Sequence, residues 1–168
     1  MSFKKILPTE IPGNAVHLIG YDWMLITAGN KEHFNTMTAA WGGLGFLWME
    51  PTATIFIRPQ RYTYEFVEKY SDFTLCFFNK EHRKALKICG TKSGRDIDKV
   101  KESGLTPLVS KKGNIYFEEA RLVIECKKVY YDDIKPELFL DKSLEKIYPA
   151  HDYHRMYIGF IINCMINA

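Results

Sequence analysis

Two arginines and a threonine lie close together in the segment RPQRYT, residues 58–63. Apolar residues follow at helical spacing, so Thr63 is expected to be the N-cap of a helix. The free N–H groups of a helix start, together with guanidinium groups, suit an anion such as phosphate. Arg61 is the best single phosphate ligand here, although a solvated Arg61 beside a capping Thr63 would give the same pattern.

The segment NTMTAAWGG, residues 35–43, combines small and polar residues along an expected strand. A planar cofactor ring such as a flavin needs a flat apolar contact and several polar groups for its edge. Backbone amides beside small residues, with the side chains of Asn35, Thr36 and Thr38, supply the polar groups. Trp41 is predicted to pack near the ring or across a subunit interface. A plain strand with a buried tryptophan is the alternative.

A third segment, CGTKSGRDIDK at residues 89–99, contains a glycine-rich loop. It lacks the spacing of a phosphate-binding P-loop and follows a helix rather than a strand, which argues against an ATPase. As a loop that opens a second helix, it can still contact phosphate or ribityl oxygens through Ser93, Gly94 and Lys99. A turn with a basic face is the alternative.

His154 stands at the expected start of the last strand, in the segment HDYHR at residues 151–155. There it can meet a nicotinamide or the edge of a flavin, although a histidine at a strand end is more often structural. His151 and His154 make a poor metal site, because a strand splays them apart and no further ligand has suitable spacing. No metal is expected.

Length and charge restrict the class of protein. The 168 residues suit one domain, residues 1–168, and 46% apolar with 26% charged residues is an ordinary globular composition. The net charge of +3 is too small to indicate nucleic acid by itself. Between Lys80 and Lys101, however, eight Lys/Arg outnumber three Asp/Glu, a local excess of five. This stretch is either a solvated helical face or a site for an anionic group.

The four cysteines show no CxxC pair and no zinc-like spacing. The N-terminal residues have no apolar core of a signal peptide, and no apolar run is long enough to span a bilayer. These features favour a reduced, cytoplasmic protein that does not enter membranes and whose thiols pack in the core.

The pattern along the chain predicts a mainly β protein, an antiparallel barrel with helices on its flank. It indicates six or seven strands and three short helices, with too few strand–helix–strand units for a doubly wound fold. Strands are expected at 15–28 (with a break near 20–22), 34–41, 53–58, 73–78, 115–131 (split near 118–120), 137–140 and 153–166. Helices are expected after Thr63, at 80–89 and at 95–103, the last closed by Gly104.

These segments, in this order, resemble the flavin-reductase-like family and, within it, the flavoredoxin group. The matching pieces are NTMTAAWGG, RPQRYTYEFV, FTLCFF, CGTKSGRDIDKVKESGLTP, ARLVIECK and HRMYIGFI, which together span most of residues 18–160. The resemblance implies an FMN-binding split β-barrel of Greek-key type that holds FMN non-covalently at a homodimer interface. It also implies NADH or NADPH as the electron donor, or electron exchange with a redox partner protein.

The resemblance also implies roles for individual residues. One strand faces the isoalloxazine edge, two loops contact the phosphate and ribityl groups, and His154 lies near the reactive side of the flavin as the catalytic residue. The sequence departs from the family at two places: Phe160 stands where the family more often has Glu, and the less familiar stretch 132–148 is expected to form a lid that limits nicotinamide access. The implied cofactor contacts are Asn35, Thr36, Met37, Thr38, Trp41, Arg58, Arg61, Tyr62, Thr63, Cys89, Ser93, Gly94 and Lys99.

Three functions are compatible with the sequence. The first is an NAD(P)H-dependent FMN oxidoreductase that orients nicotinamide and flavin rings. The second is a non-enzymatic carrier that keeps FMN bound while partner proteins exchange electrons. The third is a basic nucleic-acid-binding barrel centred on residues 80–101, which would bind oligonucleotides in a salt-sensitive manner. The flavin-reductase resemblance favours the first and disfavours nucleic acid.

Overall fold

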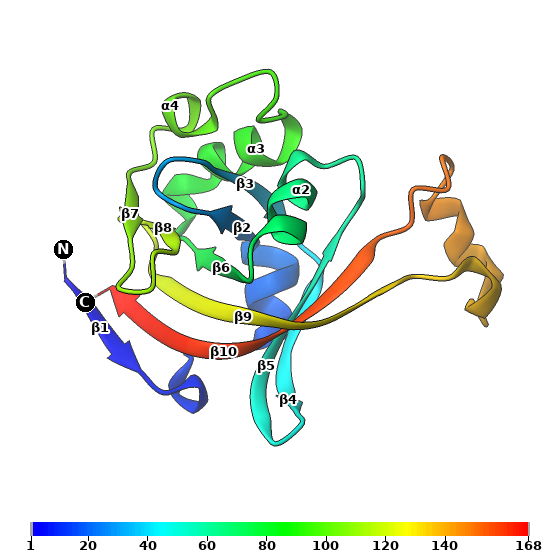
Figure 1. Cartoon of the computed structure of the whole chain (residues 1–168), viewed down its shortest axis with the longest axis horizontal. Helices are drawn as coiled ribbons and strands as arrows, with labels where there is room; N and C mark the ends of the chain where they lie inside the picture. The colour runs from blue at the N-terminus through cyan, green and yellow to red at the C-terminus, as the bar shows by residue number, and fades with distance from the viewer. Residues whose placement is uncertain (1, 168) are drawn as a thin grey trace.

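The computed structural model describes residues 2–167. One antiparallel sheet has the strand order β3-β2-β6-β9-β10-β5-β4, with β1 pairing to β10, and β7 and β8 form a separate hairpin (Figure 1). β3 and β4 are neighbours in the chain but occupy opposite edges of the sheet order. The strands are β1 (Phe3–Ile6), β2 (Met24–Gly29), β3 (Phe34–Ala39), β4 (Gly42–Leu47), β5 (Glu50–Ile57), β6 (Asp72–Phe77), β7 (Pro107–Val109), β8 (Ile115–Phe117), β9 (Leu122–Asp133) and β10 (Arg155–Asn167).

Helices flank this sheet (Figure 1), with α2 against the hydrophobic cluster that contains Ile26 of β2 and α3 against the cluster that contains Leu25, on the opposite face. Their apolar faces point inward: Phe66 and Val67 of α2 are buried, as are Leu86 and Cys89 of α3. The α-helices are α1 (Ala15–His17), α2 (Tyr62–Lys69), α3 (Arg83–Thr91) and α4 (Lys99–Ser103). Shorter turns are η1 (Pro8–Glu10), the π-helical η2 (Leu18–Asp22), η3 (Lys80–His82), η4 (Pro136–Leu138) and η5 (Lys142–Ile147). The mainly β fold with flanking helices, predicted from the sequence, is confirmed.

The strands β9 and β10 extend beyond the sheet and carry residues 134–154 as an arm (Figure 1). The pairing of β9 with β10 is irregular at two places, between Ile158 and Gly159 and between Ile161 and Asn163. At the first irregularity Gly159 lies tightly against the core, because a Cβ there would stand 2.8 Å from the ring of Phe73. The absence of a side chain at residue 159 therefore lets β10 approach β6.

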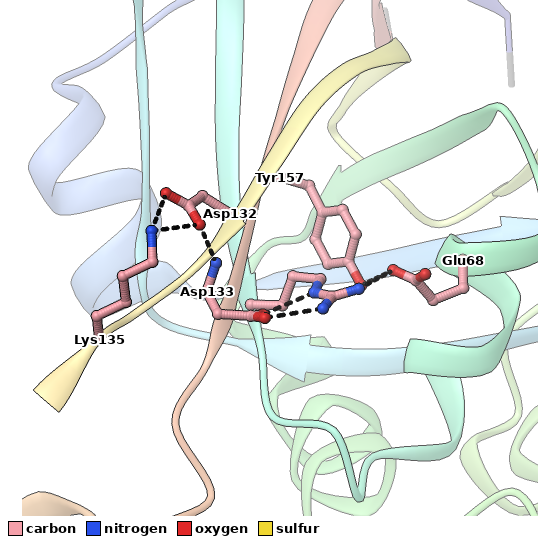
Figure 2. A network of polar contacts seen from close by, with 6 residues as sticks. Glu68, Asp132, Asp133, Lys135 and Tyr157 are labelled. Carbon is pink, nitrogen blue, oxygen red and sulfur yellow. Dashed lines mark hydrogen bonds and ion pairs between the residues drawn. The ribbon is translucent and has the colours of Figure 1, made fainter.

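A polar network fixes the base of the arm to α2 (Figure 2). The hydroxyl of Tyr157 donates to Glu68 at 2.6 Å, and Arg155 contacts the same carboxylate at 3.3 Å. Arg155 also binds Asp133 through two hydrogen bonds of 2.7 and 2.8 Å. A bidentate guanidinium–carboxylate pair restricts orientation as well as distance. Helix α2 is thereby held to the same two strands that carry the arm.

Several element predictions were wrong. Residues 15–22 are helical rather than extended, because the side chain of Asn14 accepts hydrogen bonds from the N–H groups of Val16 and His17 and so caps a helix start. Residues 137–140 are not a strand, since η4 begins at Pro136. The third helix begins at residue 99, not 95, with Asp98 as its N-cap. Residues 2–167 form ten strands rather than six or seven; β1, β4 and β7 were not predicted.

All four cysteines are free and buried, as the sequence suggested. Burial raises the pKa of Cys76 and of Cys164 to about 12, and raises that of Cys126 well above its usual value. Burial also raises the pKa of Cys89. Within residues 2–167, no helix has the length and apolar character needed to cross a membrane.

The close packing of residue 159 generates a prediction for stability. Gly159→Ala forces the new methyl group against the Phe73 ring and against Cys126, whose Cβ is 2.9 Å away. We expect a loss of about 1–3 kcal/mol in the free energy of unfolding, measured by urea denaturation. The control Gly45→Ala in β4 has no neighbouring heavy atom within 4 Å of its new Cβ and should be nearly neutral. Equal stability of the two variants would contradict the packing argument.

Candidate functional site

The start of β3 and the loop before α4 border a groove of about 400 Å³. The groove brings together residues that are up to 75 positions apart in the chain, among them residues of β3, α2 and the 92–98 loop. Its wall combines polar and charged side chains with apolar ones and one glycine. The residues predicted from the sequence that line it are Asn35, Thr36, Tyr62, Gly94 and Lys99.

Lys99 is a buried cation that joins β3 to α3. Its Nζ donates to the carbonyl of Thr36 at 2.8 Å and to the carbonyl of Cys89 at 2.9 Å. Burial, reinforced by the charge of Arg61, lowers the pKa of Lys99 to about 8. Lys99 is therefore close to its titration range at neutral pH, and a nearby anion would favour its charged form.

Arg61 is the second cation of this region. Its guanidinium donates to the carbonyl of Gly90 at 2.8 Å and to that of Cys89 at 3.5 Å, and burial lowers its pKa. The hydrogen-bond partners of Arg61 and Lys99 within residues 2–167 are all neutral carbonyls. Two neighbouring cations without a carboxylate partner make this the most favourable place in the predicted site for an anion.

Thr63 is not the N-cap of α2, contrary to the sequence prediction. The N-cap is Arg61, and Thr63 lies inside the first turn, where it is buried. The helix starts two residues earlier than predicted: the backbone is extended at Arg61 and helical from Tyr62 onward. The Thr63 hydroxyl accepts a hydrogen bond of 2.7 Å from the side-chain amide of Asn35. Thr63 thus orients Asn35 at the groove.

The 92–98 loop approaches β3 so closely that only glycine fits at residue 94. A Cβ on Gly94 would lie 2.1 Å from Oδ1 of Asn35. The hydroxyl of Ser93 accepts a hydrogen bond of 3.2 Å from the N–H of Arg95, which shapes the turn. The guanidinium of Arg95 stacks over the Tyr62 ring at 4.6 Å. The loop predicted from the sequence to close over a cofactor therefore lies beside the start of α2.

Three of the predicted cofactor contacts have side chains that are already engaged within the protein. The side chain of Met37 belongs to the hydrophobic core, and the Cys89 thiol is fully buried. The Thr38 hydroxyl donates to the carbonyl of Leu86 at 2.5 Å. Ligand contacts from these positions would have to come from backbone groups, or from the threonine oxygen as an acceptor.

Arg58 does not join Arg61, although the two are only three residues apart. Its guanidinium binds Asp152 at 2.5 Å and the carbonyl of Ile147 at 3.0 Å, and it lies over the Tyr148 ring. The side chain of Gln60 donates to the same oxygen of Asp152. A carboxylate already neutralises Arg58, so it is a poor phosphate ligand in this arrangement. Arg58 instead holds the arm to the 58–61 loop.

His154 lies in this second cluster, at the inner end of the arm. Its Nδ1 is 2.8 Å from the Tyr148 hydroxyl, and its ring packs 4.8 Å from the ring of Trp41. Only 8% of His154 is exposed, and burial, followed by the charge of Arg58, lowers its pKa to about 4. The imidazole is therefore neutral at physiological pH. Trp41 is 46% exposed and borders another groove, of about 430 Å³, beside α1 and η2.

The residues missed by sequence reasoning are those that hold the arm: Gln60, Tyr148 and Asp152. Tyr148 and Asp152 lie in a stretch whose apolar residues have neither helical nor strand-like spacing. Only their closeness to His154 in the sequence could have drawn attention to them. Oδ1 of Asp152 is buried and has no hydrogen-bond partner within residues 2–167. Across the same described range, no group of three or more His, Cys, Asp or Glu is arranged to hold a metal ion.

Comparison with known proteins gives a consistent match. Residues 16–168 match the model of the "Flavin reductase like domain". An FMN-binding domain of a flavin-reductase-like enzyme from Shewanella baltica superimposes with a TM-score of 0.72 at 16% identity, covering 98% of this chain and 77% of the other. The flavoredoxin of Desulfovibrio vulgaris gives 0.67 at 22% identity, with coverage of 86% and 69%. An NADH:FAD oxidoreductase of Streptomyces globisporus gives 0.65 at 14% identity, with coverage of 87% and 75%. These likenesses confirm the split-barrel fold.

The buried His154 generates a prediction for acid stability. Its pKa in the folded protein, about 4, lies below the usual 6.5, so between these values the unfolded chain binds a proton that the folded protein excludes. Stability should therefore fall as the pH drops from 6.5 toward 4. His154→Gln should reduce this slope, measured by urea denaturation at several pH values, whereas His151→Gln at an exposed position should retain it. The same slope in all three proteins would show that His154 titrates normally.

Proposed function

Because the chain belongs to the flavin reductase-like family, we propose that it binds FMN and transfers hydride to it from NADH or NADPH. The observation that carries the proposal is the pair of cations, Arg61 and Lys99, beside the start of α2. Neither cation has a carboxylate partner within residues 2–167, and the phosphate of FMN is an anion of the right chemistry. Bound FMN supplies the redox-active ring for hydride transfer.

The phosphate end is assigned to the region between α2 and the 92–98 loop. Arg61 uses two of its donors on carbonyls, which leaves further N–H groups for a phosphate oxygen. The first turn of α2 adds N–H groups and the positive end of a helix dipole. Gly94 allows the loop backbone to come close, since any side chain there would collide with Asn35. A neutral riboflavin would use none of these charged contacts.

The flavin ring is assigned to the far end of β3, toward Trp41 and His154. Trp41 offers an exposed aromatic face, and the 40–44 backbone borders the groove beside it. His154 is held by Tyr148 and packed on Trp41, so it can orient a ring by a hydrogen bond without carrying charge. The arm, which Arg58 holds in place, restricts water at this end of the site. In this proposal the side chains orient the rings, and none acts as a nucleophile.

A second candidate is an electron carrier that keeps FMN bound and exchanges electrons with a partner protein. The specific observation that favours it is the arm, because Ile147, Tyr148 and Asp152 contact Arg58 or His154 and limit the approach of a second ring. The likeness to a flavoredoxin is compatible with this candidate. The likeness to an NADH:FAD oxidoreductase is compatible with the first.

Phosphate recognition predicts a strong preference for FMN over riboflavin. Arg61→Ala should weaken FMN binding by about 1.5–3 kcal/mol, the usual size of a charge-assisted contact, and leave riboflavin binding nearly unchanged. Arg58→Ala serves as the matched control, because Arg58 is already paired with Asp152 and should not alter the preference. Titration of flavin fluorescence gives both affinities. Equal affinity of the parent protein for FMN and riboflavin would refute the phosphate assignment.

Turnover distinguishes the two candidates. The FMN-loaded protein should oxidise NADH or NADPH in the steady state when an electron acceptor is added, followed by absorbance at the nicotinamide band. If neither nucleotide reduces the bound flavin in stopped-flow mixing, the hydride-transfer proposal fails while FMN binding stands. The electron-carrier candidate would then be the better description.

The exposed apolar residues predict a homodimer. Phe46, Trp48 and Met49 at the β4–β5 turn are 69%, 52% and 84% exposed, and Leu140 of the arm is fully exposed. Apolar groups gathered at such sites are typical of a subunit interface. Sedimentation at micromolar concentration should show a dimer, and a charged residue in place of Trp48 should shift the protein toward monomer. A parent protein that sediments as a monomer would disprove this.

A further inference from the structure

A cavity of about 610 Å³ lies away from the proposed flavin site. It is enclosed by β1, the β7–β8 hairpin and parts of β9 and β10, at the end of the molecule opposite the arm (Figure 1). None of the residues predicted to bind FMN lines it. Apolar and aromatic side chains form half of its wall, and the rings of Phe3 and Tyr116 meet edge to face there at 5.2 Å.

The wall of the cavity contains a buried carboxylate, Glu125, which is only 2% exposed. Its oxygens accept hydrogen bonds from Ser110 at 2.8 Å, Asn114 at 3.0 Å and Asn163 at 2.8 Å. All three donors are neutral, and within residues 2–167 no cation forms an ion pair with Glu125. The Asn114 amide also donates to Asp72 at 3.3 Å, so a second carboxylate lies nearby. A buried carboxylate of this kind is stabilised by an added positive charge.

The strand β10 is irregular beside this carboxylate. The register of β9 and β10 shifts between Ile161 and Asn163, so Ile162 has no partner on β9. The shift places Asn163 opposite Glu125, where its amide reaches the carboxylate, and Ile162 forms part of the cavity wall. Irregularities of this kind often redirect a side chain at a functional site.

Three lysines line the same cavity: Lys5, Lys111 and Lys112. All three are exposed, whereas Glu125 is buried, so the positive and negative groups lie at different depths. The lysines would repel a simple organic cation but attract the anionic end of a molecule whose cationic end reaches Glu125. Apolar residues complete the lining beside these charged groups.

We propose that this cavity binds a small zwitterion whose ammonium group pairs with Glu125 and whose anionic group meets the lysines, with an apolar body between them. An apolar dipeptide with free ends has these three features. The proposal is independent of flavin chemistry, because the cavity shares no residue with the groove at β3 or with the cluster around His154.

The dipeptide Phe-Leu with free ends is a suitable probe, compared with its N-acetylated and its C-amidated forms. Titration calorimetry and amide NMR shifts of the full chain should show saturable binding of the free dipeptide, with shifts confined to residues around the cavity. N-acetylation removes the cation and should weaken binding about 10–100-fold, the size of one lost charge-assisted contact. Amidation removes the exposed contact and should weaken it by only about threefold, an effect that added salt diminishes.

Two variants test the position of the ligand. Glu125→Gln keeps the shape of the side chain and should abolish the difference between free and acetylated dipeptide. Because that change could disturb the Ser110 and Asn163 contacts, Val109→Trp provides an independent test: Val109 lines the cavity and is 45% exposed, so indole should fill the space without disturbing the core. Val129→Trp, at a position 37% exposed on the far part of β9, is the matched control and should bind as the parent protein does.

Three outcomes would overturn the proposal. The first is no saturable shift at about 10 mM dipeptide, a concentration at which even millimolar affinity would be evident. The second is equal binding of the free and acetylated forms. The third is unchanged binding by Val109→Trp. FMN affinity should be the same in all these variants, which separates this result from the proposed function.

Discussion

The strands β9 and β10 are paired from Asp133 and Arg155 at one end to Leu122 and Ile166 at the other. β6 joins one side of this pair and β5 the other, so both halves of the sheet depend on it. Because the pair is longer than the rest of the sheet, one end projects as the arm and the other forms part of a cavity wall. A single long ladder thus sets the positions of two separate surfaces, and Gly159 lets that ladder lie close to the core.

The candidate flavin site depends on a second constraint, the desolvation of two cations. Lys99 and Arg61 both point at the carbonyl of Cys89, where the end of α3 meets β3 and the start of α2. Burial, together with the charge of Arg61, lowers the pKa of Lys99, so holding two positive charges here costs free energy. The hydrogen bonds to carbonyls compensate in part and keep three elements together. A binding site that is pre-organised in this way loses little conformational freedom when an anion arrives.

The sequence predicted the fold class and most long strands, because alternating apolar residues between turn signals are specific: the break near residues 118–120 was found as expected. It could not distinguish helix from strand where the spacing of apolar residues is compatible with both. Residues 15–22 became helical through one capping side chain, that of Asn14. In the site, spacing put Arg58 and Arg61 together, but side-chain direction in a loop depends on partners far along the chain, here Asp152 and Gly90. Such long-range partners have no signature in a single sequence.

The burial of the cysteines affects how the purified protein can be handled and how its thiols respond to oxidants. Oxidants attack thiolate, and all four thiols are both covered and kept protonated by their surroundings. Peroxide in the medium therefore meets no reactive cysteine on the folded chain, and the exposed thioether of Met49 is the sulfur that it can reach. Intermolecular disulfides are likewise disfavoured, since all four cysteine thiols are buried. The folded protein should need no thiol reductant in storage, and the oxidation state of its cysteines should not depend on the redox potential of its surroundings.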